Sequence, residues 1–242
     1  MVLGLSFALA ICTVMTALSG CGTGILSPSG TGEAPGPDAS SAPPRTYIIS
    51  SPVTTLAIYG GAGTIMVTGG WGSTIAVTER AYYSDSKGLP TTSHVVNGST
   101  LALSYSCPAQ LTCGVSYDVQ VPRGVTVQVS DREGAIILAS LAGTIQAHTI
   151  AGAITATALA SPTVSLTSAA GPITAAFTAV PTSVTASTNA GAITLAVPGS
   201  AVYQVHAHTY VGSSAVTVPQ SATAGSVITA SSDLGNVKIK PS

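Results

Sequence analysis

The first residue with a chemical role is Cys21, which follows an uncharged apolar stretch at residues 2–18. The sequence Leu-Ser-Gly directly before it has the small residues that a lipoprotein signal peptidase binds in extended conformation. In such a motif the cysteine thiol is the nucleophile that receives diacylglycerol, so we expect a signal peptide at residues 1–20 and a lipid on Cys21. An ordinary cleaved signal or a membrane-spanning anchor is the alternative, although 17 apolar residues are marginal for spanning a bilayer.

A lipid on Cys21 would decide where the protein resides. Two acyl chains together hold a protein on a membrane, whereas one chain binds only reversibly. Residues 21–45 are rich in Gly, Pro, Ser and Ala and lack hydrophobic periodicity, which is typical of a flexible tether. The sequence therefore predicts an extracytoplasmic protein at the cell surface, with the lipid membrane as its partner through Cys21.

Cys107 and Cys113 are the even pair that remains after Cys12 leaves with the signal peptide and Cys21 is lipidated. In an oxidising compartment such a pair predicts a disulfide. A zinc site would need two further ligands nearby and usually has two to four residues between its cysteines. A redox centre would favour two intervening residues.

His206 and His208 are the remaining candidates for metal binding. Residues two apart on a strand share one face, so both imidazoles can point the same way. Two ligands do not complete a metal site, and His148 would add a third only if the fold brought it close. Exposed histidines on a polar strand are therefore the favoured interpretation, and we predict no bound metal and no cofactor.

Charge argues against catalysis and against nucleic acid. Only 6% of the residues are charged and the formal net charge is -1, so no basic patch is available to neutralise phosphates. Residues 134–232 contain no Asp, Glu, Lys or Arg, which excludes carboxylate pairs from that stretch. The trio at residues 131–133 (Asp-Arg-Glu) is expected to solvate a turn. We therefore expect a protein that is not an enzyme.

The elements that carry these residues are predicted to be β-strands throughout. Residues 46–121 contain short runs in which apolar and small polar residues alternate, separated by glycine clusters, as half-buried strands require. Trp71, the single tryptophan, lies beside such a cluster, and we expect it to be partly in the core rather than stacked on a sugar ring. The Gly60–Gly63 cluster lacks the GK[ST] motif of a phosphate-binding loop.

Residues 122–242 contain an internal repeat. The pattern of glycine, any residue and isoleucine begins at five positions, and companion strands lie between the copies: Gly134, Gly143, Gly152, Gly171 and Gly191. A two-strand unit of about 20 residues predicts a β-solenoid or stacked β-hairpin array, continuous with the N-terminal section. The alternation places these residues inward: Ile154, Ala156, Ile173, Ala175, Phe177, Ile193, Leu195 and Val197. It places these outward: Thr155, Thr157, Thr174 and Thr194.

The segment from residue 117 to 129 followed by these glycine-isoleucine repeats resembles the bacterial "putative adhesin" domain family, whose function is unknown. The resemblance spans residues 47–242 and implies a β-solenoid-like fold displayed on the cell envelope, with no catalytic residues. Family repeats often read Ser-Gly-Asp-Ile, whereas Ala153 and Ala192 occupy the aspartate position here.

Two classes of function are compatible with these features. The first is a surface-displayed, adhesin-like or structural module that contacts wall polymer, another protein or another copy of itself. The second is an ice-binding solenoid, which needs outward threonine pairs in register. We expect Gln146 and His148, then Ala176 and Thr178, to interrupt such an array, so the first class is favoured. An envelope-stress sensing domain is a further alternative.

Overall fold

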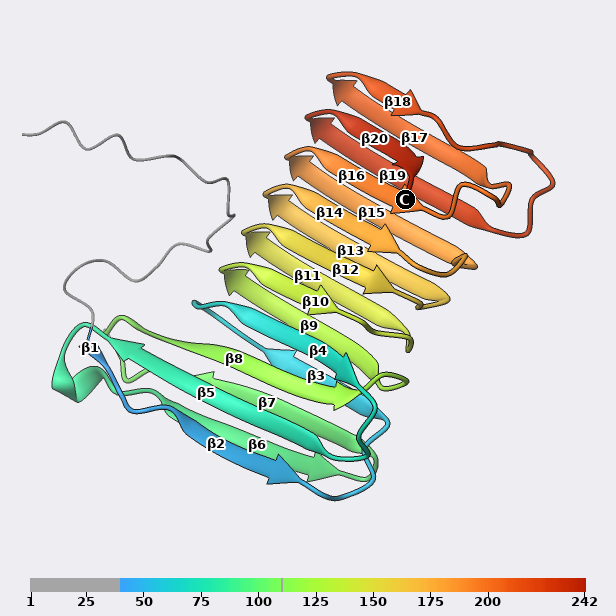
Figure 1. Ribbon diagram of the computed structural model, residues 1–242. Helices are drawn as coiled ribbons and strands as arrows, with labels where there is room; N and C mark the ends of the chain where they lie inside the picture. Colours follow the sequence, from blue (N-terminus) through green and yellow to red (C-terminus); the bar gives the residue numbers. More distant parts are fainter. Residues whose placement is uncertain (1–39, 110) are drawn as a thin grey trace, which may run out of the picture.

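Alternating apolar and polar residues form strands that wind into two facing sheets, sheet A and sheet B, in the computed structural model (Figure 1). The structure describes residues 40–109 and 111–242. Within that part the only helical element is a 3-10 turn at Ser86–Gly88. The predicted all-β, solenoid-like architecture is confirmed.

Sheet A has eleven strands in the order β1-β5-β8-β4-β10-β12-β14-β16-β20-β18, with β2 also paired to β5. Their bounds are β1 Ser40–Ser41, β2 Arg45–Ile49, β4 Ile65–Gly70, β5 Ile75–Tyr83, β8 Cys113–Pro122, β10 Ile136–Ala139, β12 Ile154–Leu159, β14 Ile173–Phe177, β16 Ile193–Val197, β18 Ser214–Val216 and β20 Val237–Pro241.

Sheet B has nine strands in the order β17-β19-β15-β13-β11-β9-β3-β7-β6. Their bounds are β3 Thr55–Tyr59, β6 Thr91–Asn97, β7 Thr100–Ser106, β9 Thr126–Glu133, β11 Ile145–Ala151, β13 Thr163–Ala170, β15 Ser183–Ala190, β17 Gln204–Val211 and β19 Val227–Leu234. Strand β6 is an exposed edge that pairs antiparallel with β7 and has little apolar alternation.

The core lies between the two sheets. Inward side chains at equivalent positions of neighbouring strands form rows that run along the stack of coils. Parallel pairing brings the first isoleucine of each repeat into register on sheet A, at Ile136, Ile154, Ile173 and Ile193. All four are fully buried, as are the alanines predicted to point inward. The predicted inward positions are therefore confirmed.

Glycine begins each sheet A strand of the array because the coils approach too closely for a side chain. Gly171 has a φ of +151°, and a Cβ there would lie 2.0 Å from the carbonyl oxygen of Gly152. Gly152 has the same relation to Gly134. Gly143, which we counted with this set, is different: its φ is not positive, and it precedes β11 of sheet B.

A second ladder consists of hydroxyl groups at the inward position near the end of the sheet B strands. Each hydroxyl donates a hydrogen bond to the carbonyl of a turn glycine in an adjacent coil. The pairs are Ser168 to Gly152 (3.1 Å), Thr188 to Gly171 (3.0 Å), Ser232 to Gly191 (2.8 Å) and Thr209 to Gly235 (2.7 Å). The hydroxyls thereby satisfy carbonyls at the turns, where a buried polar group without a partner is costly.

The outward threonines of sheet A form one column, not the two that paired threonines on an ice-binding surface would need. Thr155, Thr174 and Thr194 form one column in register. The expectation that Gln146 and His148 interrupt this column is wrong, because both lie on β11 of sheet B. A second threonine column is nevertheless absent at this level, since Thr157 pairs with Ala139.

The last two coils are not stacked in chain order. After β16 the chain passes over one level to form β17 and β18, and then returns so that β19 lies between β15 and β17. Strand β20 likewise lies between β16 and β18. The outermost coil at this end of the stack is therefore formed by β17 and β18. The C-terminal strands β19 and β20 lie between this coil and the coil of β15 and β16 (Figure 1).

Candidate functional site

The outward face of sheet B carries an open hollow of about 300 Å³ across strands β3, β9, β11 and β13. Alternation along each strand presents one side chain in two to this face. The hollow is lined by Ile58, Tyr59, Gln128, Val129, Ser130, Gln146, Ala147, His148, Ser165 and Thr167. The side chains of Ile58, Val129 and Ala147 are buried in the core beneath the hollow. The other seven residues come from four coils and meet at one surface, although they span more than a hundred positions of the chain.

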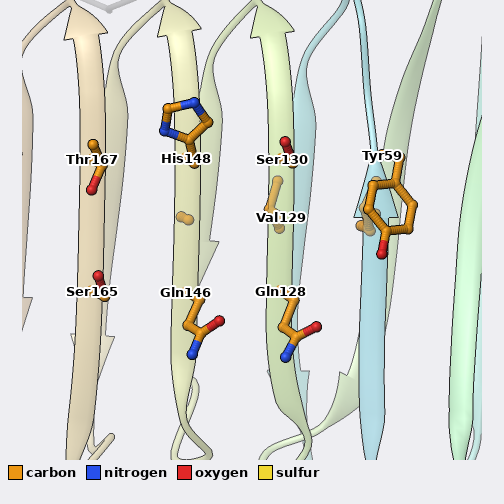
Figure 2. A pocket seen from close by; sticks show the side chains of 10 residues that line it. Tyr59, Gln128, Val129, Ser130, Gln146, His148, Ser165 and Thr167 are labelled. Carbon is orange, nitrogen blue, oxygen red and sulfur yellow. The ribbon is translucent and has the colours of Figure 1, made fainter.

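Parallel register arranges the polar side chains of the hollow in two rows, which Figure 2 shows side by side. One row contains the amides of Gln128 and Gln146, which are directly paired positions. The other row runs across Tyr59, Ser130, His148 and Thr167, each paired with the next. Adjacent strands lie about 4.8 Å apart, so each row offers hydrogen-bonding groups at that repeat.

The chemistry of the hollow is polar but uncharged. Each glutamine amide can both donate and accept hydrogen bonds, and the hydroxyls of Ser130, Ser165 and Thr167 can do the same. Tyr59 is 56% exposed and offers its ring as an apolar wall. None of the lining residues is a carboxylate, lysine or arginine.

Asp131 lies on β9 one residue beyond Ser130 and points to the opposite side, into the core. Removal from water raises the pKa of this carboxyl from its ordinary value of 3.8 to about 7, and the charge of Glu133 acts in the same direction. The backbone N–H of Arg132 opposes this by donating to one carboxyl oxygen at 3.0 Å. Arg132 and Glu133 are exposed, so the charged trio does not converge on a common site.

His206 and His208 lie on β17 and are both exposed. His148 does not join them, because β13, β15 and β19 separate its strand from β17, a separation of about 19 Å at the usual strand spacing. Among residues 40–109 and 111–242, no cluster of three or more His, Cys, Asp or Glu side chains is placed to hold a metal.

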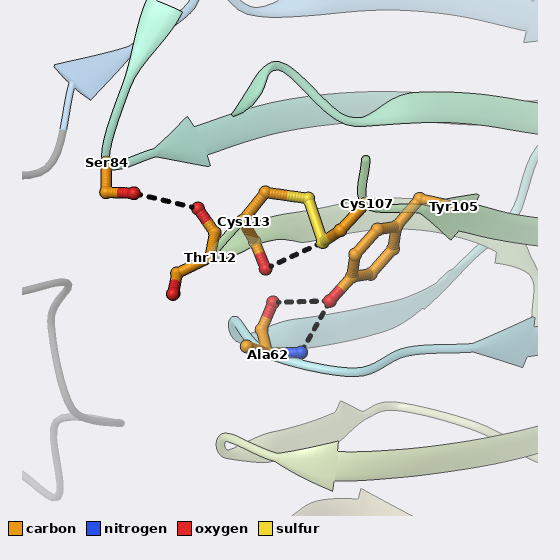
Figure 3. The surroundings of a disulfide bond; sticks show 6 residues. All are labelled: Ala62, Ser84, Tyr105, Cys107, Thr112 and Cys113. Carbon is orange, nitrogen blue, oxygen red and sulfur yellow. Dashed lines mark hydrogen bonds between the residues drawn. A yellow bond between two sulfur atoms is a disulfide. The ribbon is translucent and has the colours of Figure 1, made fainter. Parts of the chain in front are cut away.

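Cys107 and Cys113 form the predicted disulfide, with Cα atoms 5.6 Å apart. Figure 3 shows the bond beside Tyr105, whose hydroxyl accepts from the backbone N–H of Ala62 and donates to its carbonyl at 3.2 Å. Burial raises the pKa of the Tyr105 phenol. The disulfide therefore joins the start of β8 to the residue that follows β7. Tyr105, near the end of β7, contacts the turn that precedes β4.

Trp71 is not part of the core. Its side chain is 92% exposed, and the guanidinium of Arg123 lies 4.9 Å from its ring. Arg123 is fixed by a hydrogen bond from its Nε to the carbonyl of Ser140 at 3.1 Å. The expectation of a partly buried tryptophan is wrong, because Trp71 lies in the exposed turn between β4 and β5, where its ring contacts a cation rather than the core.

Sequence reasoning did not identify Tyr59 or Gln128 as site residues. The only signal in the sequence was that alternation places both side chains on the outward face of their strands. That signal identifies a shared site only when the pairing of the strands is known. Cys21 lies outside the described residues. In the portion that the structure describes, no helix has both the length and the apolar character needed to cross a membrane.

Comparison with known proteins found no matching family model and no matching curated protein. One similar solved structure is a "putative cell adhesion protein" from Clostridium sporogenes, with 11% identity and a TM-score of 0.47 over 83% of this chain and 100% of the other. Another is a "putative adhesin" from Bacteroides fragilis, with 16% identity and a TM-score of 0.38 over 83% and 97%. Similarities at these values show neither a family nor a function for this chain.

Proposed function

We propose that the protein is a non-enzymatic binding module, lipid-anchored outside the cytoplasm, that binds a neutral polar polymer through the hollow on sheet B. The observation that supports this proposal is the paired amides of Gln128 and Gln146, framed by Tyr59 and His148 on an uncharged surface. Donor and acceptor groups beside an exposed ring are suited to the hydroxyls, amides and apolar ring faces of a wall glycan.

A strand spacing of about 4.8 Å separates the hydrogen-bonding groups along each row, so an extended polymer lying across the strands can meet them in series. A charged ligand would be left without a countercharge in the hollow. Carboxylate-based catalysis would require a carboxyl group at the surface of the hollow, and none of the lining residues carries one, while Asp131, next to Ser130 in the chain, faces the core. Lipid attachment at Cys21 would keep this surface close to the cell wall.

The test is binding of the full chain, in mild detergent, to purified soluble peptidoglycan fragments and neutral wall polysaccharides by isothermal titration calorimetry. Replacing Gln128 and Gln146 together with alanine should weaken binding by roughly tenfold or more, since two hydrogen-bonding side chains are lost. A matched control replaces Thr174 and Thr194 with alanine on the outward face of sheet A and should bind normally. Equal binding by both variants, or no binding by the native chain, would refute the proposal.

A further inference from the structure

The array ends on two strands that have no neighbour on their far side within the described residues. Strand β17 is the last strand of sheet B, and β18 is the last strand of sheet A (Figure 1). The inward side chains of this coil, Val205, Ala207 and Val216, are only partly buried. The hydrophobic core is therefore open at this end.

The free part of the β17 edge is a short window with defined limits. The backbone groups of Tyr203, just before the strand, are already hydrogen-bonded on the side away from β19. Its N–H donates to the carbonyl of Pro219 and its carbonyl accepts from the N–H of Ser221, both at 3.0 Å. The N–H of Gln204 donates to Ser226 on the β19 side at 2.8 Å. In a parallel strand the peptide groups alternate between the two sides, so those of Val205, Ala207 and Thr209 face the free edge.

The window closes again at the other end of the strand. Val211 turns its carbonyl toward the inner coil and accepts from the N–H of Gly235 at 2.9 Å. The register with β19 pairs Thr209 with Ser232 and Val211 with Leu234. Three residues therefore remain free for pairing, and the middle one is Ala207.

This edge lacks the usual protection against pairing with another strand. Natural edge strands are blunted by lysine, other charges, proline or a covering loop. Residues 204–211 contain no charged residue and no proline, and the loop at Gln220 covers only the position of Tyr203. An exposed and uncharged edge of this kind is complementary to another β-strand.

We propose that two copies of this chain pair antiparallel through β17 around a two-fold axis at Ala207, and that a divalent transition metal bridges them. With Ala207 opposite Ala207 of the second copy, Val205 lies opposite Thr209 of that copy, and all three free positions exchange backbone hydrogen bonds.

This register places His206 opposite His208 of the second copy and His208 opposite His206. Both belong to non-hydrogen-bonded pairs, in which opposed Cβ atoms lie about 5 Å apart, and successive pairs on one face are separated by about 6.7 Å. Four exposed imidazoles then lie at the corners of a rectangle on the outward face of sheet B. Four nitrogen ligands satisfy the tetrahedral coordination of Zn²⁺, which the two histidines of one chain cannot complete.

The histidines identify a second copy as the partner. A foreign strand could satisfy the backbone window, but an identical strand supplies the two missing ligands at matching positions. The neighbours of His206 and His208 on β19 are Thr229 and Ser231, which are small and leave the imidazoles free to turn toward the edge. The amide nitrogen of Gln204 lies 3.2 Å from Nε2 of His206 and donates to it, which orients that ring and leaves Nδ1 as the nitrogen available to the metal.

Sedimentation velocity of the full chain in mild detergent, with Zn²⁺ or with EDTA, tests the proposal. Zn²⁺ should lower the dimer dissociation constant by roughly tenfold to a hundredfold and bind at one ion per two chains. Replacing both His206 and His208 with alanine should abolish the effect of Zn²⁺, whereas His148→Ala should retain it. A native chain that stays monomeric in Zn²⁺, or a dimer that is indifferent to the double substitution, would overturn the proposal.

The position of the axis is tested separately by cysteine cross-linking. Opposed residues of a hydrogen-bonded antiparallel pair have Cα atoms about 5.5 Å apart, within the range of a disulfide. Ala207→Cys should therefore form a covalent dimer on oxidation in the presence of Zn²⁺. Tyr210→Cys is off the axis and serves as the background control. Equal cross-linking of the two variants would refute the register.

Discussion

Asp131 and Thr149 occupy the same inward position on the adjacent strands β9 and β11, where they are directly paired. Both lie at the start of the hydroxyl ladder, and each has a buried oxygen without a hydrogen-bond partner. In the next coil the equivalent residue is Ser168, which donates to Gly152. Asp131 is thus a carboxyl group where the array otherwise uses hydroxyls.

This relationship predicts that stability falls as the pH rises. Because the folded state raises the pKa of Asp131 to about 7, folding favours the protonated acid. The stabilisation is complete below the ordinary pKa of 3.8 and is lost progressively up to about pH 7. Asp131→Ser should raise the free energy of unfolding at pH 8 by on the order of 4 kcal/mol and change it little at pH 4. Urea unfolding at both pH values measures this, and Asp233→Ser, at an exposed site on β19, should show no such difference.

Substitution of a turn glycine should disrupt the stacking of coils. A Cβ on Gly171 would overlap the carbonyl of Gly152, and its φ of +151° is unfavourable for an L-residue. Gly171→Ala should therefore reduce the free energy of unfolding by about 2 kcal/mol or more. Gly225→Ala is the matched control, because nothing lies within 4 Å of a Cβ at that position. Similar thermal melting of the two variants would contradict the close approach of the coils.

The two faces of a sheet A strand should respond differently to charge. Ile173 is fully buried and Thr174 is exposed. Ile173→Asp would place an unpaired carboxylate in the core at a cost of several kcal/mol, comparable with the stability of a whole domain. Thr174→Asp should change stability by less than about 0.5 kcal/mol. Circular dichroism melts that do not distinguish them would mean that the assigned faces are wrong.

Removal of the disulfide should have a moderate effect. Cys107 and Cys113 close a loop with a sequence separation of only 6, so the constraint on the unfolded chain is small. The double substitution with serine should reduce the free energy of unfolding by roughly 2 kcal/mol and leave the array folded. Retention of the strand signal in circular dichroism together with a lower urea midpoint would support this, and unchanged stability would argue against it.

Lipid attachment is tested by Cys21→Ala. The chain should then fail to receive diacylglycerol, and it should be either released into the medium or left unprocessed. Fractionation of membranes and intact-mass analysis distinguish these results from the native lipidated form. Cys12→Ala, within the predicted signal peptide, should be processed normally. Unchanged membrane retention and mass in the Cys21 variant would exclude a lipid on this residue.

The sequence by itself determined the strands and the inward face of each coil. A period of two fixes which side chains share a face, and the glycine before each isoleucine marks where coils turn. Ile154, Ile173 and Ile193 could therefore be placed in the core without knowledge of their partners. The disulfide between Cys107 and Cys113 could equally be predicted from the sequence, because the two cysteines lie close together in the chain.

Only the tertiary structure decided which strands are neighbours. Gly143 and Gly152 share a sequence pattern but begin strands in different sheets, and the pattern contains no information that separates them. The pairing of Gln128 with Gln146, and the return of β19 to the inner side of β17, depend on register between distant segments. Such pairings arise from the packing of whole coils against one another, which no local periodicity encodes.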